Sequence, residues 1–124
     1  MKDRLDTIFE MQKKLNEDII ARRNLCFSKE EWLQKQVLAM ISELAELLDE
    51  VNFKWWKNKR ELNDGYIREE LTDILHFFVS MCLFAGMDAA ELFDCYLKKN
   101  KENFDRQNGL SQKQGYDASK CGSE

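Results

Sequence analysis

Four stretches of the chain carry apolar residues at the three- and four-residue spacing that is typical of amphipathic helices. The second stretch shows the pattern most clearly, because its apolar stripe is unbroken over three turns. That stripe consists of Val37, Met40, Ile41, Leu44 and Leu48. The pattern predicts helices over residues 3–24, 28–56, 66–85 and 88–105.

Polar residues mark the expected ends of these helices. Ser28 followed by Glu31, and Asp88 followed by Glu91, are capping-box signatures at the starts of the second and fourth helices. Residues 57–65 are polar and end in Asn-Asp-Gly, which predicts a loop. The chain contains no proline. Proline costs about 3 kcal/mol inside a helix, so its absence fits a mostly helical protein.

The elements together predict an all-α fold with an antiparallel, four-helix-bundle-like core. We expect residues 1–106 to form one domain and residues 107–124 to form an extended or mobile tail. A chain of 124 residues is enough for one domain and not two. It is short for a bundle with so many large apolar side chains, which favours a homodimer that shares core surface.

Charge and cysteine content narrow the possible partners. The formal net charge is −4, which argues against nucleic acid as the main partner. No apolar run approaches the roughly 20 residues needed to span a membrane, and the first residues lack the apolar core of a signal peptide. The cysteines show no metal-binding spacing, which predicts reduced thiols in a cytoplasmic protein. They are Cys26, Cys82, Cys95 and Cys121.

The second predicted helix carries an acidic pair away from its apolar stripe. Glu43 and Glu46 are three residues apart, so their carboxylates can converge on one point. Acidic pairs at this spacing are common on helix faces that are simply exposed to solvent. Taken alone, the Glu43/Glu46 pair favours this interpretation over a metal site.

A second acidic pair, Glu70 and Asp73, changes this interpretation. It shares a helical stripe with Phe77 and Phe84, which is unusual for a solvated face and typical of a pocket wall. Two acidic pairs on facing helices can surround Mg²⁺, or Mn²⁺, with oxygen ligands. Glu69 and Glu50 are weaker candidates for supporting these ligands.

Two amides lie within the apolar stripe of the first predicted helix, Gln12 and Asn16. They could form hydrogen bonds between helices, or they could recognise the polar edge of a nucleobase, since an amide both donates and accepts. Aromatic residues could wall such a pocket, and the single histidine, His76, could contact the base or sugar. The aromatic candidates are Trp55, Trp56, Phe77 and Phe84.

The fourth predicted helix has a polar and basic face made by Lys99, Asn103 and Arg106. These residues could simply complement the negative end of the helix dipole. The same face suits phosphate oxygens, because an arginine can bind two of them at once. Lys54 and Lys57 could add charge, and Tyr116 could close over a ligand; the three residues belong to other segments of the chain.

These motifs resemble those of a known group of enzymes. ELAE and EELTD match the ExxE…ExxD signature of the MazG-like all-α NTP pyrophosphatase superfamily. The longer segments MQKKLNEDI, SELAELLDEVNFKWWK, EELTDILHFF and KKNKENFDRQNG resemble the dimeric dUTPase family within it. The resemblance covers about residues 8–116.

The resemblance implies a function and a set of roles. The family hydrolyses dUTP, and often dUDP, to dUMP, with magnesium as cofactor. The implied magnesium ligands are Glu43, Glu46, Glu70 and Asp73. The implied nucleoside contacts are Gln12, Asn16, Trp56, His76 and Phe77. The implied phosphate contacts are Lys99, Asn103 and Arg106, to which we add Lys57.

The sequence therefore predicts a Mg²⁺-dependent dUTP pyrophosphohydrolase that acts in nucleotide-pool sanitation. Glu43 is the expected catalytic base, with Glu46 as the alternative. Two other hypotheses remain open. The enzyme could act on dCTP or modified deoxynucleotides, or the chain could be a non-enzymatic helical interaction module whose acidic stripe is only solvated.

Overall fold

The computed structural model describes residues 2–112 and residue 115, and the predicted contact from Tyr116 lies outside them. The described residues form four α-helices and no strand, which confirms the predicted all-α class. They divide after Asp88 into two compact units. The first unit contains α1 (Arg4–Arg23), α2 (Lys29–Glu50) and α3 (Asp64–Phe84). The second contains α4 (Ala89–Gln107).

The helices of the first unit begin at polar caps. The Asp3 carboxylate accepts from the Asp6 backbone N–H at 2.8 Å and completes a capping box at α1. The Ser28 hydroxyl accepts from the Glu31 backbone N–H at 3.1 Å, so this predicted start is confirmed. Asn63 caps α3 in the same way, and that helix begins at Asp64, two residues before its predicted start.

The end of α2 differs from the prediction. The helix stops at Glu50 instead of continuing to Trp56, because Asn52 adopts the left-handed conformation with φ 58°. The Asn52 side chain then donates to the Arg60 carbonyl and accepts from the Arg60 N–H, both at 2.9 Å. The apolar residues after Val51 continue the helical pattern but belong to the connection over residues 51–63.

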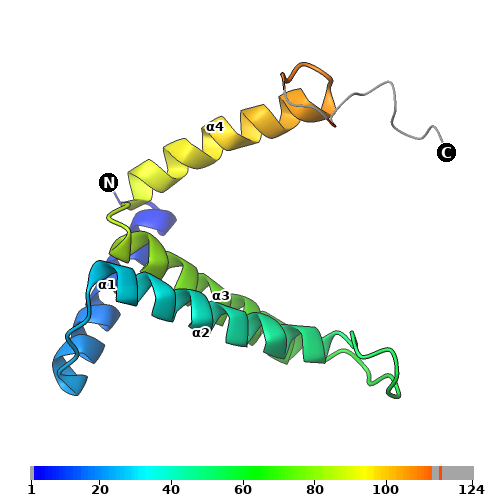
Figure 1. Cartoon of the computed structure of the whole chain (residues 1–124), viewed down its shortest axis with the longest axis horizontal. Helices are drawn as coiled ribbons and strands as arrows, with labels where there is room; N and C mark the ends of the chain where they lie inside the picture. Colours follow the sequence, from blue (N-terminus) through cyan, green and yellow to red (C-terminus); the bar gives the residue numbers. More distant parts are fainter. Residues whose placement is uncertain (1, 113–114, 116–124) are drawn as a thin grey trace. The chain divides into compact units, whose positions relative to one another are not determined.

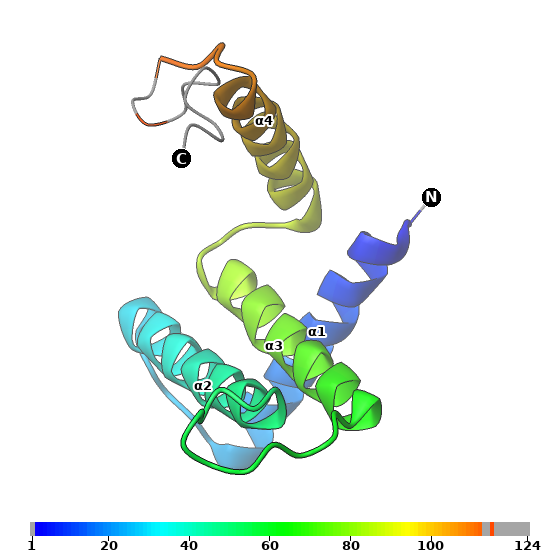
Figure 2. The ribbon, with the colours of Figure 1, turned by 90° about the vertical axis from the view of Figure 1, so that its right-hand side faces the viewer.

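Helices α2 and α3 form an antiparallel hairpin, and α1 packs against α3 (Figures 1 and 2). The rings of Trp32 and Phe84 stack with their centroids 4.6 Å apart, which joins the start of α2 to the end of α3. The two helices run in opposite directions from this contact. Glu46 lies fourteen residues after Trp32 on α2, and Glu70 lies fourteen residues before Phe84 on α3, so these two side chains also meet. This register decides which polar side chains face one another.

Few apolar side chains of the first unit are fully buried within it. Phe9, Val79 and Cys82 are buried between the helices, whereas Met11 is 66% exposed and Leu71 is 53% exposed. No single helix among the described residues is long and apolar enough to cross a membrane.

Candidate active site

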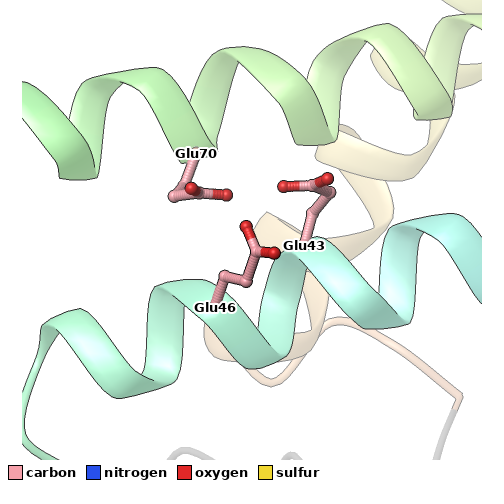
Figure 3. Close-up of side chains that lie close together, drawn as sticks. All are labelled: Glu43, Glu46 and Glu70. Carbon is pink, nitrogen blue, oxygen red and sulfur yellow. The ribbon is translucent and has the colours of Figure 1, made fainter.

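Three carboxylates meet between α2 and α3. One oxygen from each of Glu43, Glu46 and Glu70 lies within 4.8 Å of the other two, and Figure 3 shows the three groups pointing toward one another across the hairpin. Glu43 and Glu46 converge because they are one turn apart on α2, and the hairpin register brings Glu70 to them. We call these three residues the acidic cluster.

The electrostatics of the acidic cluster favour a positive charge. The Glu43 and Glu70 carboxylates each have one buried oxygen, Oε2, that accepts no hydrogen bond from the described residues. The pKa of Glu70 is raised from 4.5 to about 7, first because it can share a proton with Glu43, then because of lost hydration and the nearby charge of Glu46. A hard divalent cation would satisfy the same oxygens, so this donor set fits Mg²⁺ or Mn²⁺.

A cavity of about 520 Å³ lies beside the acidic cluster. All three helices of the first unit line it, and Glu43 belongs both to the acidic cluster and to the cavity wall. Asp73 also lines the cavity, next to the cluster rather than within it. The predicted residues Gln12, Asn16, His76 and Phe77 line the same cavity. The structure therefore brings these predicted residues into one region, and their roles in binding a nucleoside or a metal stay predictions.

The two amides predicted in α1 form a hydrogen-bonded network with α3. Gln12 is 7% exposed and donates through Nε2 to Asn16 Oδ1 at 2.9 Å and to Ser80 Oγ at 3.0 Å. Its Oε1 lies 2.5 Å from His76 Nδ1, and the Ser80 hydroxyl donates to Asn16 Oδ1 at 3.1 Å. The interhelical hydrogen bond that the sequence left open is thus present, and the same groups form a polar patch on the cavity wall.

Trp56 and Lys57 are not brought to this cavity. Both lie in the connection after α2, where Trp56 is 60% exposed and contacts the edges of Phe53 and Trp55. Lys57 lines a separate hollow of about 620 Å³ formed by the end of α2 and the connection that follows it. The resemblance implies that Trp56 contacts the nucleoside; Trp56 is not among the residues that line the cavity, and its role stays a prediction.

The predicted phosphate contacts lie in the second unit. On α4, Arg106 is 9% exposed; its Nε donates to Glu102 at 3.2 Å and its Nη1 to Asn103 at 3.4 Å. Lys99 is exposed on the same helix. These residues are described only relative to one another, so their contact with a nucleotide stays a prediction.

Trp32, Gln36 and Ser80 are among the residues of the cavity wall that sequence reasoning did not assign to the pocket. Spacing held a signal for each of them. Gln36 is two turns before Glu43 and one turn after Trp32, and Ser80 is one turn after His76, so all lie on faces already assigned to the pocket.

Comparison with known proteins agrees with this site. The chain is 29% identical to the dCTP pyrophosphatase of Enterobacteria phage T4, over 86% of this chain and 81% of that protein. A shorter match, 49% identical over 41 residues, is to the dCTP pyrophosphatase of Enterobacteria phage LZ5 and covers 33% of this chain and 24% of that protein. No solved structure gives a significant match.

A family of known proteins matches nearly all of the three-helix unit, apart from a few residues at each end of that unit. The sequence model of the family described as dUTPase matches residues 4–85, a span that contains the acidic cluster and every residue of the cavity wall. This match extends over more than half of the chain and confirms the predicted resemblance. The chain belongs to the all-α dUTPase family.

Proposed function

We propose that this protein is a magnesium-dependent pyrophosphohydrolase that converts a pyrimidine deoxynucleoside triphosphate, dUTP or dUDP in the first instance, to its monophosphate. One observation carries the proposal: Glu43 belongs both to the acidic cluster and to the wall of the amide-lined cavity. A metal-binding group and a nucleoside-sized hollow therefore share a side chain.

The acidic cluster and Asp73 would hold the metal, which supplies positive charge for the phosphate oxygens when bound. Glu43 has an unpaired, buried oxygen at the edge of the cavity, and this oxygen is suited to accept the proton of the water that attacks the α-phosphorus. Glu46 is the alternative base, although it is exposed. Gln12 and His76 are placed to orient the nucleoside through the polar patch.

The comparisons also favour a second candidate substrate, dCTP, because both phage relatives are named for it. The family description favours dUTP. The two reactions share the metal, the attacking water and the bond that breaks, and they differ only in the base.

We further propose that the working form is a cytoplasmic homodimer. The thiols of Cys26, Cys82 and Cys95 are free. Apolar side chains on α1 and α3 surround a second hollow of about 490 Å³, away from the acidic cluster. Ile8, Met11, Leu15 and Leu75 line it and are 37–66% exposed. A second copy would bury this surface.

The activity is tested by pyrophosphate release from dUTP, dCTP and dTTP in the presence of Mg²⁺. We expect Glu43→Gln and Asp73→Asn to lower kcat/KM by roughly 100-fold or more, the loss typical of a catalytic base or metal ligand. Glu30→Gln is the matched control, since Glu30 lies on the same helix outside the site. Intact turnover in both site variants would contradict the mechanism.

A thermal-shift measurement separates the enzyme from a simple interaction module. Mg²⁺ and a non-hydrolysable dUTP analogue should each raise the melting temperature of the protein, and more so together. A module with a merely solvated acidic face would show neither shift.

A further inference from the structure

Gln36 lines the cavity and carries an unpaired, buried acceptor. Its carbonyl oxygen, Oε1, is buried and accepts no hydrogen bond from the described residues. The side chain lines the same cavity as Glu43 and the Gln12 network. A buried acceptor without a partner costs free energy, so its persistence in a binding cavity points to a donor on the ligand.

Two neighbouring polar side chains, Ser80 and Gln12, have no proton left for this oxygen. In the hairpin register, Gln36 is four residues after Trp32 and Ser80 is four residues before Phe84, which places the two polar residues level with each other. The single hydroxyl proton of Ser80 is already donated to Asn16. Both protons of the Gln12 amide are also used, on Asn16 and on Ser80.

The position of Gln36 suits the base of a nucleotide whose phosphates lie at the acidic cluster. Seven residues of helix separate Gln36 from Glu43, about 10.5 Å along the axis, a distance that a nucleoside can span. Trp32 and Phe84, whose rings stack on each other, line the cavity one turn beyond Gln36 and offer an apolar surface to the base.

We infer that Gln36 reads the 4-position of the pyrimidine and favours cytosine over uracil. This inference rests on the proposed function: it keeps the proposed reaction and makes its second candidate, dCTP, the preferred substrate in place of dUTP. Cytosine carries an amino donor at that position, whereas the carbonyl that thymine and uracil share there is an acceptor. The Gln36 carbonyl would accept from the amino group of dCTP, while dUTP would set two acceptors against each other.

The test compares Gln36→Met with Gln34→Met. Methionine keeps the length of the side chain and removes the carbonyl; Gln34 is an exposed residue two positions earlier on the same helix. We expect Gln36→Met to lower the ratio of kcat/KM for dCTP to that for dUTP about tenfold, within the discrimination of one base contact. Gln34→Met should keep the wild-type ratio.

Binding of the products dCMP and dUMP, followed by calorimetry, gives a readout that does not depend on turnover. Wild type should bind dCMP more tightly, and Gln36→Met should remove the preference. The melting temperature of Gln36→Met should be equal to or above that of wild type, because the variant removes an unpaired buried acceptor.

The outcomes distinguish this inference from the proposed function. If wild type hydrolyses both nucleotides and Gln36→Met leaves the ratio unchanged, the role of Gln36 is wrong and the enzymatic function stands. If wild type neither hydrolyses any deoxynucleotide nor binds either monophosphate, both are wrong.

Discussion

Glu70 is the residue whose ionisation the fold changes most clearly among the described side chains with a resolved shift. Its pKa of about 7 results from a carboxyl neighbour that can share its proton, lost hydration and nearby negative charge. At neutral pH the metal-free acidic cluster therefore holds a proton about half of the time. A divalent cation and this proton compete for the same oxygens.

The raised pKa predicts how the stability of the metal-free protein depends on pH. Between pH 4.5 and about 7 the folded protein holds a proton on Glu70 that the unfolded chain has released. The free energy of unfolding should therefore fall as pH rises through this window. Melting temperatures measured in EDTA from pH 5 to pH 8 should decrease for wild type.

Two variants isolate this effect from other carboxylates. Glu70→Gln should flatten the decrease, because glutamine does not titrate. Glu69→Gln, which alters the exposed neighbour on the same helix, should keep the wild-type slope. Equal slopes for wild type and Glu70→Gln would show that Glu70 is not the group responsible.

The connection after α2 shows how one residue can end an element. Asn52 occupies a left-handed conformation that most side chains disfavour, and its amide pairs with the backbone of Arg60 in both directions. The connection is therefore closed on itself, which fixes where the chain turns toward α3.

Substitutions at Asn52 should separate conformation from hydrogen bonding. Asn52→Gly keeps the backbone freedom and loses both hydrogen bonds, for a cost of about 1–3 kcal/mol in the free energy of unfolding. Asn52→Ala also strains the backbone, for about 1–2 kcal/mol more. The free energy of unfolding measured by urea denaturation should be highest for wild type, lower for Asn52→Gly and lowest for Asn52→Ala. If Ala matched Gly, the left-handed conformation would carry no cost.

The elements and part of the site could be predicted because they depend on local spacing. Helical periodicity located all four helices, and the three-residue spacing of Glu43 and Glu46 predicted their convergence. The end of α2 was predicted wrongly, because apolar residues continue past the left-handed Asn52. Spacing places Gln36 and Ser80 on faces assigned to the pocket, but that they lie level with each other follows from the register between α2 and α3, which no local pattern encodes.

At the scale of the molecule, the first unit leaves much apolar surface uncovered by its own helices. If the proposed dimer buries the α1–α3 surface, a charge placed there should weaken association. We expect Leu75→Lys to raise the dimer dissociation constant by at least about tenfold, measured by sedimentation. Leu62→Lys, an exposed position in the connection after α2, is the control. A wild-type monomer at micromolar concentration would contradict the proposal.

The hairpin is closed at both ends, by the stacked rings of Trp32 and Phe84 at one end and by residues 51–63 at the other. The acidic residues lie between these two closures, where their mutual repulsion alone would separate the helices. Bringing the three carboxylates together costs conformational entropy, and this cost is met when the protein folds and not when a cation binds. A cation entering the hairpin meets a preorganised set of oxygens, so more of their attraction is available as affinity.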